Sequence, residues 1–376
     1  MTGFKLENWK NFQKADVELQ RRVFLIGPNA SGKSNFIDGL RFLNDVVSVG
    51  GGLQSAVKER GGVSRLRCLA ARRYSDLTVA VTIGTDEVPD EWHYELTFNQ
   101  DSQRHPEIRR ELVTKRGRVV IDRPDQDDRS DPERLSQTYL EQVNVNKEFR
   151  EIADFLRTLR YLHIVPQLVR DPERSVGVFE DPFGGDFLEQ IARTPLTTQR
   201  ARLKRITAAL KVAVPQLLEL ELSRDEGTAH LRGRYEHWRP QGAWQSENQF
   251  SDGTLRLIGL LWSVLDGSGP LLLEEPELSL HPEVVRFLPQ LFARVQQRSQ
   301  RQMIISTHSP ELLADEGIGL DELLLLNPDA EGTEVQLAGS RHDIRGLMDS
   351  GIPLPQILVA RTRPRDVEQM ALFGSG

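Results

Sequence analysis

The first fifty residues pass from one pattern of apolar positions to another. FKLENWKNFQKADVEL (4–19) alternates polar and apolar residues on both sides of a polar centre, which predicts two short strands joined by a turn. VFLIG (23–27) is apolar throughout and predicts a buried strand. Helical spacing follows from about 32 to 47 and stops at three glycines (50–52), after which GLQSAVKERGG (52–62) predicts a short helix.

Polar and apolar residues alternate again between residues 76 and 123. The segments that show this pattern are DLTVAVTIG, EWHYELTFN, RRELVTKRG and RVVIDR, and the pattern predicts a run of antiparallel strands. The next stretch, DRPDQDDRSDPER (122–134), is charged and has no periodicity. A mobile surface loop is therefore expected there.

The second half of the chain alternates strands with helices. Helical spacing covers 135 to about 159 and TTQRARLKRITAALKVAVPQLLEL (197–220), and ELELSRD (219–225) and TAHLRGRYEHW (228–238) predict strands. FSDGTLR (250–256) then opens an apolar helix, and PLLLEE (270–275), QMIISTH (302–308) and ELLLLN (322–327) predict buried strands, with a helix over 282–297. Strands alternating with helices in this way predict a parallel sheet covered by helices, and an α/β fold.

Composition narrows the class of protein without identifying it. The 376 residues are 38% hydrophobic and 27% charged, and no apolar run approaches the roughly 20 residues that a membrane span requires. The N-terminus does not resemble a signal peptide, and the single cysteine, Cys68, excludes an intrachain disulfide and a CxxC metal site. A net charge of −7 argues against a protein coated for nonspecific nucleic-acid binding. We expect a cytoplasmic protein with no membrane partner.

GPNASGKS (27–34) fits the pattern G-x-x-x-x-G-K-[ST] and lies between a predicted strand and a predicted helix. Glycines let the backbone wrap phosphates, and N–H groups at a helix N-terminus point at the anion. Lys33 is expected to contact the β- and γ-phosphates and Ser34 to ligate Mg²⁺. The expected nucleotide contacts are Gly27, Pro28, Asn29, Ala30, Ser31, Gly32, Lys33, Ser34 and Asn35, although Asn35 also suits the start of a helix. The bland alternative is a glycine-rich turn with an incidental lysine, and the motif alone does not separate a kinase from a GTPase or an ATPase.

Two acidic residues, Glu274 and Glu275, end the predicted strand PLLLEE. Paired carboxylates at the end of a buried strand are costly unless they face a ligand or a cation. Beside a P-loop, the first would hold Mg²⁺ and the second would orient the attacking water. The alternative is a strand that runs into an acidic surface turn. His308, just past another apolar strand, is either a structural residue or a contact to the γ-phosphate, and the order of the motifs favours the second interpretation.

The order of these motifs resembles the ABC-type ATPase superfamily, and within it the RecF/SMC/OLD-like branch of small bacterial AAA15/AAA21-type ATPases. The residues that carry the resemblance are NWKNF, GPNASGKSN, FSDGTLR, EEPELSLHP and ISTHSP. The resemblance implies that Ser251, Gly253 and Thr254 of the FSDGT turn are phosphate contacts of an ABC signature, although Ser-Asp-Gly before an apolar run is also an ordinary helix cap. It also implies a D-loop over 278–281, with His281 in place of the usual Asp, and Gln167 as the candidate glutamine-loop ligand of the metal, with a plain loop residue as its alternative.

The resemblance implies an architecture as well. The fold class expected is α/β: a P-loop NTPase of the ABC-type head, with an antiparallel β subdomain and a helical insertion. The expected parts are an N-terminal lobe over 1–125, a helical insertion over 126–220 and a C-terminal lobe over 221–376, which together form one discontinuous ATPase domain. Long-armed SMC proteins are excluded, because a heptad array and a zinc-hook CxxC are both missing from the sequence.

The leading functional hypothesis is an ATP- and Mg²⁺-dependent homodimer that hydrolyses ATP and acts as a switch or clamp. Catalysis is assigned to Lys33, Glu275 and His308. Two alternatives remain: an OLD-like nuclease component that needs a separate nuclease subunit, and a transporter-type ATPase subunit. Arg200, Lys204 and Lys211 share one helical face, which is either an ordinary solvated face or a contact for double-stranded DNA. The family resemblance further suggests a separate effector, a nuclease or toxin, in anti-phage defence or DNA repair.

Overall fold

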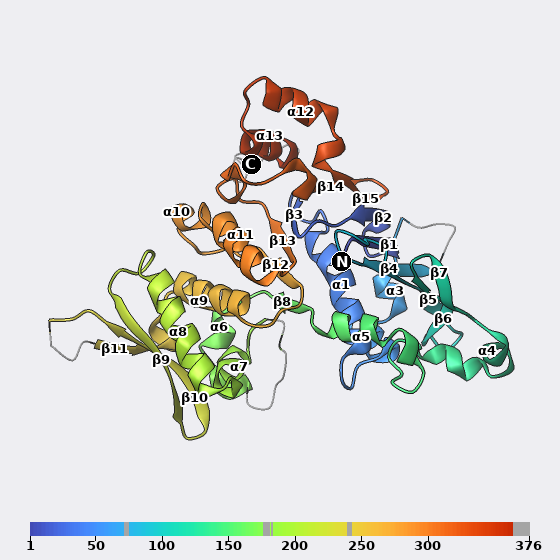
Figure 1. Ribbon diagram of the computed structural model, residues 1–376, viewed down its shortest axis with the longest axis horizontal. Coiled ribbons are helices and arrows are strands. Elements are labelled where there is room, and N and C mark those ends of the chain that lie inside the picture. The colour runs from blue at the N-terminus through green and yellow to red at the C-terminus, as the bar shows by residue number, and fades with distance from the viewer. Residues whose placement is uncertain (71–74, 176–180, 182, 239–242, 364–376) are drawn as a thin grey trace, which may run out of the picture. The chain divides into compact units, whose positions relative to one another are not determined.

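The computed structural model describes residues 1–70, 75–175, 181, 183–238 and 243–363 (Figure 1). The chain forms two compact units. The first comprises Met1–Leu159, Arg301–Pro310 and Ile318–Gly376, and the second comprises Arg160–Gln300 and Glu311–Gly317. The three-part division expected from the sequence remains a prediction.

An antiparallel sheet of six strands makes up much of the first unit, in the order β2-β1-β4-β5-β6-β7. The paired strands predicted at the N-terminus are its first two members, and the strand run predicted between residues 76 and 123 forms the rest. The strands are β1 (Gly3–Trp9), β2 (Phe12–Glu18), β4 (Leu77–Ile83), β5 (Trp92–Gln100), β6 (Pro106–Lys115) and β7 (Arg118–Arg123). Both predictions are confirmed.

Helix α1 (Lys33–Val47) packs against this sheet through aromatic side chains. Phe36 meets Phe4 edge-on, with 5.1 Å between ring centroids, and Phe42 stacks on Phe98 at 5.5 Å. Such ring pairs add to the stabilisation from apolar burial. Nearby, Cys68 is 2% exposed and its N–H donates to the Asn8 carbonyl at 3.0 Å. The remaining α-helices of this unit are α2 (Leu53–Glu59), α3 (Val63–Leu66), α4 (Gln126–Ser130), α5 (Arg150–Arg157), α12 (His342–Asp349) and α13 (Leu354–Thr362).

The first unit also contains four strands of a mixed sheet, ordered β15-β14-β3-β13. Strand β3 (Arg22–Ile26) lies between β13 (Met303–Thr307) and β14 (Leu323–Asp329) and is parallel to both, whereas β15 (Gly332–Leu337) pairs antiparallel with β14. Every residue of β3 and β13 is buried, as a central parallel strand requires. The α/β architecture predicted from the alternation of strands and helices is confirmed.

The prediction of a mobile surface loop over residues 122–134 is wrong. Helix α4 and a 3-10 turn (Pro132–Ser136) occupy this stretch, and Asp125 caps α4 with a capping box. Arg123 is fully buried between two carboxylates, with ion pairs of 3.2 Å to Glu111 and 2.8 Å to Asp128. Charges inside a protein are tolerated when they are paired and hydrogen-bonded. Two of the charged residues that suggested a solvated loop, Arg123 and Asp128, therefore belong to a buried network. Helical structure over 135–159 is likewise limited to a 3-10 turn (Asn146–Glu148) and α5.

The second unit combines helices with a sheet of three antiparallel strands, ordered β11-β10-β9. These are β9 (Leu217–Asp225), β10 (Thr228–Tyr235) and β11 (Ala243–Ser246). In the same unit, β8 (Arg160–Leu162) pairs parallel with β12 (Leu271–Glu274). Helix α8 (Leu196–Leu210) packs on β9 and on α9 (Asp252–Leu265). The other helices are α6 (Pro166–Val169), α7 (Phe187–Arg193), α10 (Pro282–Val285) and α11 (Leu288–Ser299), so the helix predicted over 282–297 is interrupted near Phe287.

Within the described part of the chain, every helix is too short or too polar to cross a lipid bilayer.

Candidate nucleotide-binding site

The loop between β3 and α1 has the backbone form of a phosphate cradle. The chain turns through Ala30 (φ 62°) and Gly32 (φ 98°) before α1 begins at Lys33. The Lys33 side chain is buried, and its Nζ donates to the carbonyls of Gly27 (2.9 Å) and Pro28 (3.1 Å). A positive charge is therefore held over the loop by main-chain oxygens.

The N-terminus of α1 is suited to an anion. Its N-cap, Gly32, has no side chain to accept a hydrogen bond from the first turn, and that turn contains no acidic residue. Helix N-termini leave backbone N–H groups that favour negative charge. Ser34 is exposed in this first turn, where its hydroxyl is accessible to a metal ion. The loop thus fits the triphosphate and Mg²⁺ expected from the sequence.

Gly27 is required by close packing at the start of the loop. A Cβ on this residue would lie 2.5 Å from the Ser31 Oγ and 2.7 Å from the Leu326 carbonyl. Both distances are shorter than any van der Waals contact, and the second involves backbone that cannot turn away. The glycine therefore lets the loop fold back against β14.

Asn11 ties the middle of the loop to two other segments. Its Nδ2 donates to the Ser31 carbonyl (3.0 Å) and to the Thr333 Oγ1 (2.7 Å), and Thr333 itself donates to the same carbonyl at 2.9 Å. Asn35 donates to the Asn11 Oδ1 at 2.7 Å, while the Asn35 carbonyl accepts from the Trp9 indole at 3.1 Å. The side chain of Asn35 is therefore engaged in supporting the loop.

His308 lies at the same sheet edge as the phosphate loop. Strands β3 and β13 are parallel neighbours with Ile26 opposite Thr307, so Gly27 and His308 follow at matching positions. The carboxyl ends of parallel strands form the usual ligand edge of such sheets. His308 is exposed, and the turn that carries it is held by the Ser309 N–H, which donates to the Thr307 Oγ1 at 3.0 Å.

The second unit contains the FSDGT turn, and its cap is confirmed. Ser251 is the N-cap of α9: its Oγ accepts from the Thr254 N–H at 3.2 Å and bonds the Thr254 hydroxyl at 2.8 Å. Ser251 is exposed and Thr254 is buried. The turn therefore presents a helix N-terminus and an accessible hydroxyl on the surface of this unit.

The signature turn and the predicted D-loop are in contact. A Cβ on Gly253 would lie 2.4 Å from the Ser279 carbonyl, so only glycine permits this approach. Ser279 has a φ of 62°, a conformation that costs energy for a residue other than glycine. His281 caps α10, because its Nδ1 accepts from the Glu283 N–H at 3.2 Å. An aspartate at this position would cap a helix in the same way.

The two carboxylates that end the predicted strand PLLLEE, hereafter the Walker B carboxylates, have different surroundings. Glu274 ends β12, and its Oε2 accepts a hydrogen bond of 2.5 Å from the Tyr161 hydroxyl. The backbone of Glu275 adopts a left-handed conformation, with a φ of 44°. Burial lowers the pKa of the Arg256 guanidinium, and the carboxylates of Asp252 and Glu275 oppose that shift. Arg256 therefore lies in the field of both the signature turn and the Walker B carboxylate.

Gln167 is exposed in α6, a short helix that packs on α9. Arg170 follows at the end of the same helix and donates to the Phe250 carbonyl at 2.7 Å, with an ion pair of 2.6 Å to Asp252. The signature turn is thus fastened to the segment that carries the candidate glutamine-loop residue.

The structure divides the predicted site residues between its two units. The phosphate loop and His308 belong to the first, and the signature turn, the Walker B carboxylates and Gln167 belong to the second. Their catalytic and ligand roles remain predictions. Sequence reasoning missed Asn11, Tyr161 and Arg170 as supporting residues, although NWKNF, which contains Asn11, had been singled out.

The described residues hold no group of three His, Cys, Asp or Glu side chains arranged for a metal ion. This does not conflict with Mg²⁺, which proteins commonly bind through one or two side chains together with substrate phosphates.

Comparison with known proteins agrees with this geometry. A family model described as "AAA domain, putative AbiEii toxin, Type IV TA system" (AAA_21) matches residues 22–314. A solved Smc head bound to the C-winged helix domain of ScpA aligns with a TM-score of 0.55 at 14% identity, over 89% of this chain and 96% of that chain. An Smc head with an extended coiled coil, bound to the C-terminal domain of ScpA from Pyrococcus furiosus, gives 0.51 at 12% identity, over 93% and 99%. These likenesses show a shared fold, and no curated protein matches the chain.

Proposed function

Because the chain belongs to the AAA_21 family and has the fold of an ABC-type ATPase head of the RecF/SMC-like branch, we propose that it is an Mg²⁺-dependent ATPase that works as an ATP-controlled homodimer. The observation that carries the proposal is the phosphate loop, where a helix N-terminus without a side-chain cap meets a buried lysine held by two carbonyls.

In this proposal the loop N–H groups and Lys33 hold the triphosphate. Lys33 exchanges its bonds to the Gly27 and Pro28 carbonyls for phosphate oxygens, which costs little because the amine is already withdrawn from bulk water. Ser34 and Glu274 would hold Mg²⁺, with Gln167 as the third proposed ligand, and the ion when bound would neutralise charge on the phosphate oxygens. The Tyr161 hydroxyl fixes the orientation of Glu274, as residues behind metal ligands usually do.

Hydrolysis is assigned to Glu275, which orients the attacking water and accepts its proton, and to His308, which contacts the γ-phosphate. The left-handed backbone of Glu275 supports this role. Strained conformations persist where the surroundings over-determine them and are concentrated at functional sites.

The signature turn supports the dimer. A chain that already binds a nucleotide at α1 has little use for a second phosphate-binding helix N-terminus at α9. The second N-terminus has a use if Ser251, Gly253 and Thr254 contact the γ-phosphate that a second copy of the chain holds. Two nucleotides would then be enclosed between two subunits, and hydrolysis would release the dimer.

The Glu275→Gln variant tests the proposal directly. It should bind ATP without turning it over and accumulate as a particle of twice the 42.7 kDa monomer mass in mass photometry. Lys33→Ala is the matched control and should stay monomeric with ATP. A Glu275→Gln protein that is saturated with ATP and still monomeric would rule out the dimer.

Double-stranded DNA is one proposed target. Arg200 and Lys204 on α8, with Lys211 at its end, are exposed, and no ion pair is found for them among the described residues. Duplex binding should weaken steeply between 50 and 200 mM salt and fall several-fold in an Arg200→Gln/Lys204→Gln variant. Unchanged binding in that variant would exclude this face.

A partner protein is the second proposed target, and the likeness to Smc heads supports it. The two solved Smc heads are each bound to a domain of ScpA. We propose a cytoplasmic role in anti-phage defence or DNA repair with a separate nuclease or toxin as effector. Copurification with the products of neighbouring genes, with and without ATP, would identify it. Metal-dependent DNA cutting by the purified chain would instead support an OLD-like nuclease, and stable binding to a membrane permease would support a transporter subunit.

A further inference from the structure

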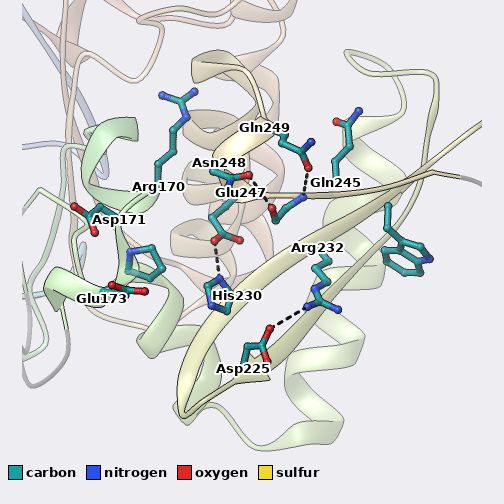
Figure 2. Close-up of a pocket in the computed structure, with 13 residues that line it drawn as sticks. Arg170, Asp171, Glu173, Asp225, His230, Arg232, Gln245, Glu247, Asn248 and Gln249 are labelled. Carbon is teal, nitrogen blue, oxygen red and sulfur yellow. Dashed lines mark hydrogen bonds and ion pairs between the residues drawn. The ribbon is translucent and has the colours of Figure 1, made fainter.

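A polar pocket of about 570 Å³ lies in the second unit, between the segment that follows α6 and the strands β10 and β11 (Figure 2). This volume is within the range of small-molecule sites. We propose that the pocket binds a nucleotide unit, either free or at the end of a single strand, and that its occupancy acts on the signature turn. The second half of this proposal rests on the proposed ATPase function.

One wall of the pocket is rich in hydrogen-bond donors. Trp244, Gln245, Asn248 and Gln249 come from β11 and the 3-10 turn after it, and the Trp244 side chain is 44% exposed. Asn248 and Gln249 use their carbonyl oxygens on Ser246, which leaves their amide N–H groups for a ligand. An exposed indole with several amides is the combination that proteins use to stack a base and to bond its edge.

Charged groups of both signs complete the lining. Arg232 lies 3.7 Å from Asp225, an ion pair longer than a hydrogen bond, so its guanidinium retains donors for a phosphate. Asp171 and Glu173 stand on the opposite side, as Figure 2 shows, and can accept from exocyclic amines or sugar hydroxyls. A ligand with donors, acceptors, an aromatic plane and a negative charge satisfies all of these groups together.

The inner end of the pocket is held rigidly. Glu247 is buried, its Oε1 lies 2.8 Å from the His230 Nδ1, and its Oε2 accepts from the Leu231 N–H at 3.0 Å. Glu247 begins the 3-10 turn that leads into Phe250, and the Phe250 N–H donates back to the Glu247 carbonyl at 3.3 Å. The pocket and the signature turn therefore share a continuous, hydrogen-bonded backbone.

Two further contacts connect the pocket to the signature. Arg170 lines the pocket and fastens the Phe250 carbonyl and Asp252. The Phe250 ring packs against Gly233 of β10 so closely that a Cβ there would lie 2.9 Å from it. A ligand that draws Arg170 or β10 towards itself changes the support of the α9 N-terminus, where Ser251 is the cap.

Binding is tested in the Lys33→Ala background, so that the phosphate loop does not contribute. The probes are AMP, by titration calorimetry, and a fluorescein-labelled ten-residue oligothymidylate with unlabelled competitor. Trp244→Ala and Arg232→Gln should each lower the affinity for the probe about fivefold or more. The matched controls are Trp238→Ala, at an 81% exposed residue outside the lining, and Arg234→Gln, at a residue paired with Glu219. Both should keep the affinity for the probe within about twofold of the unsubstituted background.

The two probes separate the sources of the nucleotide. Tighter binding of AMP assigns a free nucleotide, and tighter binding of the oligomer assigns a strand end. If neither probe binds at 1 mM AMP or 0.1 mM oligomer, or if the pocket and control variants behave alike, the proposal is overturned and the pocket is left to a partner protein.

Coupling is measured separately. The better probe should change the ATP hydrolysis rate at least threefold, and Arg170→Gln should return that ratio to about one while the probe still binds. Hydrogen exchange of the Thr254–Leu257 amides, with and without probe, measures the same coupling in a protein that does not hydrolyse ATP. A chain without ATPase activity therefore refutes the proposed function alone, whereas probe binding that leaves both rate and exchange unchanged refutes the coupling.

Discussion

Asn11 donates a hydrogen bond of 3.0 Å to the main-chain carbonyl of Ser31, twenty residues further along the chain. The bond joins the turn between β1 and β2 to the phosphate loop. Through Thr333, which donates to the same carbonyl, the start of β15 is joined to the loop as well. The shape of the loop is thus imposed by a distant turn and by the start of β15, in addition to its own glycines.

Replacing Asn11 with Ala should lower the free energy of unfolding by about 1–2 kcal/mol, because three hydrogen bonds are lost at a partly buried site. The affinity for mant-ATP should fall roughly tenfold, since a loosened loop must be ordered on binding. Urea unfolding and fluorescence titration measure the two effects. Gln13→Ala, in the exposed part of β2, is the control and should change neither, while a destabilised Asn11→Ala with full ATP affinity would contradict a positioning role.

Asp38 of α1 should give stability that disappears in acid. Burial disfavours its charged form, but Arg60 and Lys10 outweigh burial and hold the pKa of the Asp38 carboxyl below its ordinary value. A lowered pKa stabilises the folded state fully above about pH 4, and this contribution is lost as the pH falls through the folded-state pKa. Asp38→Asn should therefore cost about 2 kcal/mol from pH 5 to 8 and progressively less below pH 4.

Urea unfolding between pH 3 and pH 8 measures this difference. Asp86→Asn is the control, because its pair with Arg21 is at the surface and should contribute less than about 1 kcal/mol at any pH. A cost for Asp38→Asn that stays constant down to pH 3 would show that the carboxylate charge is not the source.

Gly253→Ala should disrupt the contact between the signature turn and the segment around Ser279. The added Cβ would lie 2.4 Å from the Ser279 carbonyl, and relieving such overlap typically costs about 1–3 kcal/mol. ATP hydrolysis should fall at least tenfold, whereas mant-ATP binding to the phosphate loop should persist. Gly346→Ala in α12 has open space around its Cβ and should be neutral or stabilise by about 0.5–1 kcal/mol. Equal behaviour of the two variants would remove the argument for close approach.

Two substitutions of Ser251 separate its structural role from its proposed functional one. Ser251→Ala loses the cap of α9 and should cost about 1 kcal/mol of stability. Ser251→Asp keeps the cap and the stability, but it places a negative charge where the γ-phosphate of a second subunit is proposed to bind. Hydrolysis and dimer formation should therefore fail in Ser251→Asp, as measured by phosphate release and mass photometry. Normal turnover by that variant would contradict the shared site.

Local pattern was sufficient for most strands and for the phosphate loop. Strand β3, the glycine-rich turn and α1 are adjacent in the sequence, so periodicity and the motif located them together. Ser251 as a cap was predictable for the same reason, because capping depends on neighbouring residues only.

Contacts between distant segments were not predictable in this way. The Asp122–Arg134 stretch looks like a solvated loop until Arg123 is seen between Glu111 and Asp128, and this pairing depends on tertiary structure. The same applies to Asn11 with Ser31, to Tyr161 with Glu274 and to Arg170 with Asp252. In each pair a polar residue finds its partner across the fold, and neither residue type is unusual where it stands.

Because Cys68 is buried, the native chain can be used for thiol labelling without removing a cysteine. Cys68 is the single cysteine and is 2% exposed, so a cysteine introduced at a surface position will be the reactive one. Val49 is fully exposed two residues after the end of α1 and suits a spin label. In a monomer the label has no second spin to interact with, whereas in an ATP-bound dimer it interacts with the label of the second subunit. Pulsed dipolar spectroscopy on Val49→Cys would then follow subunit association on ATP addition and its reversal on turnover, with the other residues of the chain unchanged.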